Sequence, residues 1–131
     1  MTKEEAVKDT WKERALRQAE KDPTGRDAHE VGSKLDQGKP RAALVLQDFG
    51  PALLRVADVG TFGANKYTPH GWVSVPNGEE RYLDAAMRHL LKRGDDPDSG
   101  IDHLAHAAWN VLAALTLRLD MEVVPSKKVS E

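Results

Sequence analysis

The sequence has 131 residues, of which 40% are hydrophobic, and this fits one compact domain with a core of ordinary size. Its 19 basic and 21 acidic residues nearly cancel, so we expect no attraction for a polyanion such as duplex nucleic acid. Cysteine is absent, which excludes disulfides and thiolate metal ligands. The apolar runs are short and the N-terminus is charged, so we expect a cytoplasmic protein that neither crosses nor binds a membrane.

The first part of the chain predicts one helix and a long loop. Residues 2–21 have a thin apolar stripe, which is typical of a peripheral helix, and we assign residues 1–22 to it. A loop rich in Gly, Pro and charged residues follows, and RAALVL, residues 41–46, predicts a short extended stretch. We assign residues 23–122 to a single helical nucleotide-binding domain and residues 123–131 to a flexible tail.

Three further helices are predicted after this loop. The second helix covers residues 50–63, with Pro51 in its first turn and Gly63 as its stop. The third covers residues 78–93, and the fourth starts at Ser99 with Asp102 as capping-box partner. The expected fold is therefore all-α, a bundle of about four helices with a loop-rich N-terminal segment.

The stretch TFGANKYTPHGW, residues 61–72, concentrates rings and cations in one loop. Flat rings facing water contribute nothing to a fold, so a ligand is one explanation. We expect Tyr67 or Trp72 to stack on a base and Lys66 to bind phosphate. The alternative is a packed corner between two helices, in which Trp72 plugs the bundle.

The fourth predicted helix has two unlike faces. Its apolar stripe is expected to be core and consists of Ile101, Leu104, Ala108, Val111, Leu112, Leu115 and Leu119. The opposite side carries His103, His106 and Asn110, bordered by alanines rather than charges, so it is also expected to be buried. These polar groups either meet a ligand or are hydrogen-bonded core residues.

The third predicted helix and the preceding loop supply cations. Arg81, Asp84 and Arg88 lie at i, i+3 and i+7, which fits either a surface ion-pair ladder or guanidinium groups that bind phosphate. His89 lies on a neighbouring stripe. The loop adds three cations near two glycines, Lys34, Lys39 and Arg41, although their spacing is not that of a P-loop.

An ordered series of motifs resembles a known family. KLDQGKPRAALVL, RVADVGTFGANKYTPHGW, RYLDAAMRHLLKRGDDPDSG and DHLAHAAWNVLAALTL are similar to a phage-borne family of dATP/dGTP diphosphohydrolases (MazZ-like), itself related to MazG-type pyrophosphohydrolases. The resemblance implies a helical bundle that forms homo-oligomers, commonly dimers, in the cytoplasm of the host cell. It also implies a purine nucleotide bound between helices and cleavage between its α- and β-phosphates with Mg²⁺.

One departure from the wider superfamily concerns the metal. That superfamily holds Mg²⁺ on Glu-x-x-Glu and Glu-x-x-Asp motifs, because carboxylates at this spacing share a helix face, and this sequence contains neither. The remaining metal candidates are Asp84, Asp98, His103 and His106. Imidazoles suit Mn²⁺ or Zn²⁺ better than Mg²⁺.

Two functions from different classes are consistent with these residues. The first is a metal-dependent pyrophosphohydrolase using Mg²⁺ or Mn²⁺, with Asp84, His103 and His106 as catalytic residues. Phosphates would meet Lys34, Lys39, Arg41, Lys66, Arg81, Arg88 and His89, and the base would meet Tyr67, Trp72 and Asn110. The second is a sponge that sequesters a signalling or modified nucleotide against host defence, without metal or chemistry. A third hypothesis is a helical structural protein.

Overall fold

The structure is a computed structural model that describes residue 13 and residues 21–123, with side chains through Asp120. Apart from residues 13, 21 and 123, the helix predicted over residues 2–21 and the tail predicted over residues 123–131 lie outside the described residues. The described part contains no strand, which confirms the all-α fold class. Its helices are α3 (Ala43–Leu46), α4 (Gly50–Lys66), α5 (Gly78–Leu90) and α6 (His103–Val123), with a 3₁₀ turn η1 (Gly71–Ser74). None of these helices has the length and apolarity needed to cross a membrane.

The chain divides into two compact units, Met1–Val45 and Leu46–Glu131. The boundary falls within α3, so the single domain predicted over residues 23–122 includes parts of both units. That domain assignment stays a prediction.

The loop of the first unit is organised around the carboxylate of Asp22. Its Oδ1 accepts hydrogen bonds from the backbone N–H of Thr24, at 2.6 Å, and from the Thr24 hydroxyl. Its Oδ2 accepts the N–H of Lys34, twelve residues along the chain, at 2.7 Å. One carboxylate therefore ties the two ends of this loop together.

Acidification is expected to release this loop. The hydroxyl of Thr24 and the N–H of Lys34 lower the pKa of Asp22 from 3.8 to about 2. Because the folded-state pKa lies below the ordinary value, the stabilisation is complete above pH 3.8 and is lost as the pH falls towards about 2. The Lys34 amide resonance should titrate with a midpoint near the lower value in the wild type and not at all in Asp22→Asn. A midpoint at the ordinary value would contradict the hydrogen bonds.

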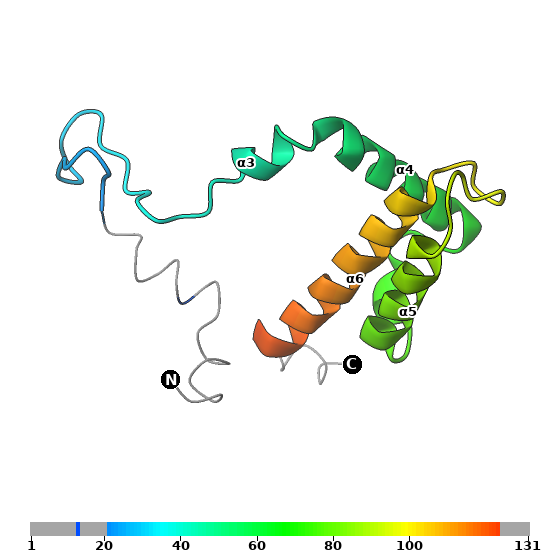
Figure 1. The fold of residues 1–131 in the computed structure, drawn as a ribbon. Helices are drawn as coiled ribbons and strands as arrows, with labels where there is room; N and C mark the ends of the chain where they lie inside the picture. Colours follow the sequence, from blue (N-terminus) through cyan, green and yellow to red (C-terminus); the bar gives the residue numbers. More distant parts are fainter. Residues whose placement is uncertain (1–12, 14–20, 124–131) are drawn as a thin grey trace. The chain divides into compact units, whose positions relative to one another are not determined.

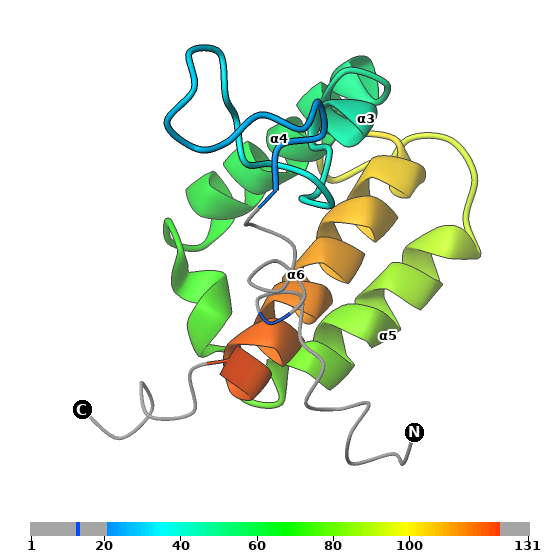
Figure 2. The ribbon, with the colours of Figure 1, turned by 90° about the vertical axis from the view of Figure 1, so that its left-hand side faces the viewer.

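In the second unit, α6 lies between α5 and α4 (Figures 1 and 2). Small side chains allow this close packing. The buried apolar residues are Val59, Ala86, Ala105, Ala107, Ala113 and Ala114. At Gly60 on α4, a Cβ atom would lie 3.3 Å from the indole Nε1 of Trp109, so glycine allows α4 to approach this large ring on α6.

Three aromatic rings join η1, α5 and α6. The rings of Trp72, Tyr82 and Trp109 contact one another edge to face, with centroids 5.7–6.1 Å apart. The hydroxyl of Tyr82 donates a hydrogen bond to the carbonyl of Trp72 at 2.8 Å. This aromatic corner, Trp72–Tyr82–Trp109, fixes η1 against the two helices.

In the first half of the chain, one predicted element type and one predicted helix end are wrong. Residues 43–46 form the short helix α3 instead of an extended stretch. Helix α4 continues past Gly63 to Lys66, and the N–H of Tyr67 bonds to the carbonyl of Gly63. Glycine permits a helix stop but does not impose one when the following residues can continue the helix.

The ends of the last two helices also differ from the prediction. Helix α5 stops at Leu90, before the predicted residue 93. Helix α6 begins at His103 and not at Ser99, because the carboxylate of Asp102 accepts the N–H of Leu104 at 2.8 Å and so acts as the N-cap. The shorter helices leave a longer loop between them.

The predicted core stripe of α6 is largely exposed within this unit. Leu104 is 65% exposed, Leu112 48% and Leu115 46%. The alanine-bordered stripe of α6, which carries His103 and Asn110, is the buried one. Small residues permit a closer helix approach than leucines do, so they take the inner face.

Candidate functional site

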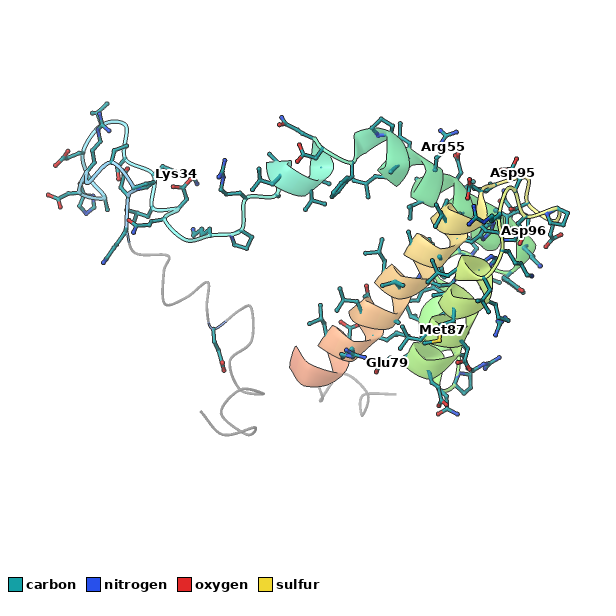
Figure 3. All side chains as sticks on the ribbon, viewed as in Figure 1. Lys34, Arg55, Glu79, Met87, Asp95 and Asp96 are labelled. Carbon is teal, nitrogen blue, oxygen red and sulfur yellow. The ribbon has the colours of Figure 1, made fainter. Side chains whose placement is uncertain are left out.

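The loop between α5 and α6 folds back onto the start of α6. The N–H of Asp96 bonds to the carbonyl of Ile101 at 2.8 Å, and the N–H of His103 bonds to the carbonyl of Gly94 at 2.9 Å. Gly94 and Gly100 have positive φ angles, +79° and +73°, which glycine adopts without strain. This closed loop holds Asp96 against the ends of both helices, and Figure 3 shows it at the opposite end of α5 from Glu79.

Three possible metal ligands meet at this loop. His89 lies in the last turn of α5, Asp96 in the loop, and His103 at the first position of α6. The Nδ1 atoms of the two histidines are 2.9 Å apart, and Oδ2 of Asp96 is 4.0 Å and 3.9 Å from them. We call these residues, His89, Asp96 and His103, the His–Asp–His cluster; within the described part of the chain they are the one group with this spacing.

The two oxygens of Asp96 have different surroundings. Oδ1 accepts the backbone N–H of Asp98 at 2.8 Å, and this bond lowers the pKa of Asp96. Oδ2 faces the two imidazoles. The carboxylate is therefore ionised at neutral pH, with one oxygen anchored and the other directed at the cluster.

His106 supports the cluster from the next turn of α6. Its ring stacks on His89, with centroids 4.7 Å apart and an interplanar angle of 14°. Its Nε2 lies 2.6 Å from the hydroxyl of Ser99, and Phe62 contacts its ring edge to face. Burial is the largest cause that lowers the pKa of both histidines, so both imidazoles are neutral near pH 7.

A cation and an exposed ring lie at the end of α4. The Nζ of Lys66 is 2.8 Å from Oδ2 of Asp98, which is the main reason that the pKa of Lys66 is raised. The same Nζ lies 5.5 Å from the ring of Tyr67, whose side chain is exposed. Because Asp98 also donates its N–H to Asp96, Lys66 and the His–Asp–His cluster belong to one hydrogen-bonded network.

The donor set of the cluster fits a divalent cation. Two imidazole nitrogens and a carboxylate oxygen are common protein ligands for first-row metal ions. Without a metal, the two Nδ1 atoms at 2.9 Å require a proton between them. A cation satisfies the same two lone pairs and adds charge balance for Asp96.

The structure brings some of the predicted site residues together and separates others. His89, His103, His106, Asp98 and Lys66 lie in or beside the cluster. Asn110 lies one turn further along α6, where its side-chain amide donates to the carbonyl of His106 at 2.8 Å. Its predicted contact with a base stays a prediction.

The remaining candidates in the second unit lie elsewhere. Trp72 is packed in the aromatic corner. Arg81 donates to the carbonyl of Pro76 at 3.2 Å, and Arg88 is exposed on α5. Asp84 is not a member of the His–Asp–His cluster. The loop cations belong to the other unit and are all exposed: Lys34, Lys39 and Arg41.

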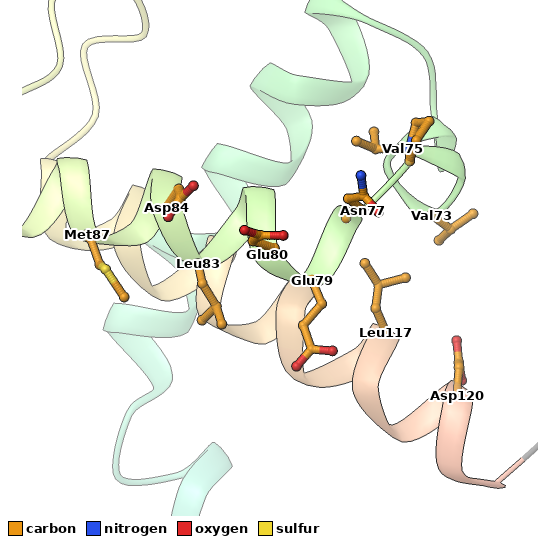
Figure 4. Close-up of a pocket in the computed structure, with 12 residues that line it drawn as sticks. Val73, Val75, Asn77, Glu79, Glu80, Leu83, Asp84, Met87, Leu117 and Asp120 are labelled. Atoms are coloured by element: carbon orange, nitrogen blue, oxygen red, sulfur yellow. The ribbon is translucent and has the colours of Figure 1, made fainter.

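Asp84 lines an open cavity of about 830 Å³ beside η1, α5 and α6 (Figure 4). Its lining mixes apolar side chains, such as Leu83 and Leu117, with the acidic groups Glu79 and Asp120. Four carboxylates and no cationic side chain line this cavity, so it does not suit a polyphosphate. The cavity and the cluster are separate places on the molecule.

Asp96 and Ser99 are functional candidates that sequence reasoning missed. Both lie in GDDPDSG, a composition typical of a turn, which explains their presence without any site. The sequence feature that could have indicated a site here was a histidine on each side of the loop, at positions 89 and 103. Only the loop's closure onto α6 shows which of its three aspartates faces the two histidines.

Comparison with known proteins identifies one matching family. The family model described as "dATP/dGTP diphosphohydrolase, N-terminal" matches residues 29–125. The match covers both histidine-bearing helices and the loop between them. No curated protein and no solved structure matches the chain.

Proposed function

The chain belongs to the dATP/dGTP diphosphohydrolase N-terminal family, and we propose that it hydrolyses purine deoxynucleoside triphosphates with a divalent metal ion. Water adds across the bond between the α-phosphorus and its bridging oxygen, which gives a nucleoside monophosphate and pyrophosphate. The observation that carries the proposal is the His–Asp–His cluster, joined to Lys66 through Asp98. We further propose that the protein is encoded by a phage and acts in the host cytoplasm.

The cluster would hold the metal ion through His89, Asp96 and His103. When bound, a divalent cation supplies positive charge that stabilises the negative charge developing on phosphate oxygens. We assign the carboxylate role to Asp96 rather than Asp84, because Asp96 faces both imidazoles and Asp84 lines the acidic cavity. His106 positions His89 by stacking on it.

Residues at the end of α4 would bind the nucleotide. The pKa of Lys66 is raised by Asp98, so its ammonium group stays charged and can meet a phosphate. Tyr67 is 75% exposed and offers a free π face to a base beside that cation. Phosphate binding stays a prediction for the remaining cations, Lys34, Lys39, Arg41, Arg81 and Arg88.

The experiment is a nucleotide panel with product analysis. The purified chain is incubated with each dNTP and NTP, with a divalent metal or with a chelator, and products are separated by chromatography. We expect dATP and dGTP to give monophosphate and pyrophosphate with metal and to stay intact with chelator. Release of diphosphate and orthophosphate, or activity that survives the chelator, would contradict the proposal.

Sequestration is a second candidate function, and one observation favours it. The cluster contains a single carboxylate, and Asp98 is already paired with Lys66. A nucleotide could therefore be bound without being cleaved, as a sponge acting against host defence requires. In the same panel, this function predicts an unchanged nucleotide that still raises the melting temperature in chelator.

We propose that the exposed apolar stripes of α5 and α6 meet the same stripes of a second copy. Leu90 and Leu104 lie at the joined ends of the two helices, and Leu112 and Leu115 continue the stripe along α6. Large exposed apolar patches mark interfaces between proteins.

The oligomeric state is expected to depend on this stripe. Light scattering after gel filtration should give a dimer for the wild type and a monomer for Leu112→Glu, because a charge in an apolar interface is left without a partner. The matched control is Leu54→Glu on α4, at a site that is also exposed, and it should stay dimeric. A monomeric wild type would rule out the interface.

A further inference from the structure

We propose that the His–Asp–His cluster selects a first-row transition metal ion of the Mn²⁺ to Zn²⁺ series over Mg²⁺, and that it binds this ion through the Nδ1 atoms of His89 and His103. The inference deepens the proposed function by naming the class of metal ion. It rests on that function only in taking the His–Asp–His cluster to be the metal site. The family name specifies no metal.

The donor atoms of the cluster favour a transition metal ion over Mg²⁺. Mg²⁺ prefers oxygen ligands in an octahedral shell and is usually held by carboxylates, water and substrate phosphates. Two of the three ligands here are imidazole nitrogens. Imidazole suits later ions such as Fe²⁺, Ni²⁺ and Zn²⁺, and the affinity of nitrogen sites for first-row divalent ions is lowest for Mn²⁺, rises to Cu²⁺ and falls again at Zn²⁺.

The carboxylates of Asp98 and Asp102 are engaged outside the cluster. Oδ2 of Asp98 is paired with Lys66 at 2.8 Å. The carboxylate of Asp102 caps α6 through the N–H of Leu104. Both carboxylates are thus held by other partners, whereas Oδ2 of Asp96 lies within 4.0 Å of both Nδ1 atoms, so Asp96 is the oxygen donor that is directed at the cluster.

The two ligand nitrogens are held in place before any ion binds. His103 is 5% exposed and its backbone N–H is bonded to Gly94. The ring of His89 lies against the ring of His106, and His106 is itself held by Ser99. A site built in this way costs little ordering when an ion binds, and its supporting residues fix the direction of the ligand nitrogens.

The test measures metal binding by the full chain without any nucleotide. Metal-free protein is titrated with Co²⁺ while the visible absorption is recorded, and with Zn²⁺, Mn²⁺ and Mg²⁺ by calorimetry. We expect one Co²⁺ per chain, a visible band that Zn²⁺ abolishes, and transition-metal affinities on the order of tenfold or more above that for Mg²⁺. Equal or tighter binding of Mg²⁺, or no binding of the other ions, would overturn the inference.

Variants of the cluster residues test where the metal ion binds. His103→Gln and Asp96→Asn should abolish the Co²⁺ band, and the asparagine can still accept the N–H of Asp98, so the loop is kept. The matched control is His29→Gln, which removes an exposed histidine of the other unit and should bind Co²⁺ as the wild type does. Circular dichroism verifies folding. A band that survives in Asp96→Asn and His103→Gln would place the metal elsewhere and overturn the assignment.

These outcomes separate the inference from the proposed function. Transition-metal binding without hydrolysis of any nucleotide would remove the function and keep the metal class. Hydrolysis supported by Mg²⁺ in a protein that binds no Co²⁺ or Zn²⁺ would keep the function and remove the metal class.

Discussion

His103→Gln is expected to lose hydrolysis of dATP and dGTP almost completely. His103 contributes one of three ligands, so its loss should reduce kcat/KM by more than the ~100-fold typical of losing a residue that only supports a ligand. His106→Ala, which removes such a support, should cost on the order of 10- to 100-fold. Both losses are measured as initial rates at saturating metal and at several nucleotide concentrations.

Two control variants make this result specific. His29→Gln changes an exposed histidine of the first unit, and Asp84→Asn changes the carboxylate that lines the acidic cavity. Both should keep near wild-type rates if the His–Asp–His cluster is the active centre. If Asp84→Asn were inactive and His103→Gln active, the active site would lie in the acidic cavity and not at the cluster.

Trp109→Ala is expected to cause the largest loss of stability. The indole contacts Trp72 and Tyr82 edge to face and lies beside Gly60, so its removal opens a cavity where η1, α4, α5 and α6 meet. The free energy of unfolding should fall by about 3 kcal/mol. Urea denaturation followed by circular dichroism measures this change.

Tyr67→Ala is the matched aromatic control. This ring is largely exposed, so its removal should leave the free energy of unfolding within about 0.5 kcal/mol of the wild type. If Tyr67 stacks on the base, the same variant should raise KM for the nucleotide. A Trp109→Ala protein as stable as Tyr67→Ala would show that the aromatic corner does not hold the helices together.

The sequence allowed the helices to be predicted better than their packing. Pro51 and the periodic apolar residues identified α4, and the alanine-bordered stripe of α6 was expected to be buried. The leucine stripe was assigned to the core because hydrophobicity alone does not show which apolar face of a helix is buried. The start of α6 was predicted at Ser99 with Asp102 as capping-box partner, but the Asp102 carboxylate itself accepts the N–H of Leu104 and caps the helix.

The histidines of the site could be predicted from the sequence, but its carboxylate could not. His103 and His106 were recognisable because imidazoles on an alanine-bordered face need partners. Asp96 was hidden in a run of turn-forming residues, and its position depends on backbone bonds that close the loop. Trp72 and Tyr67 looked alike in sequence, but the Trp72 ring packs against Tyr82 and Trp109 and is half-buried, whereas the Tyr67 side chain is exposed.

The most direct test of metal-dependent hydrolysis is a ³¹P spectrum of dGTP with the wild-type chain. With a divalent metal, we predict that the dGTP resonances are replaced by those of dGMP and pyrophosphate in equal amounts, and that chelator stops this change. Intact dGTP with shifted or broadened resonances, in metal and in chelator alike, would contradict hydrolysis and identify a protein that binds the nucleotide without cleaving it.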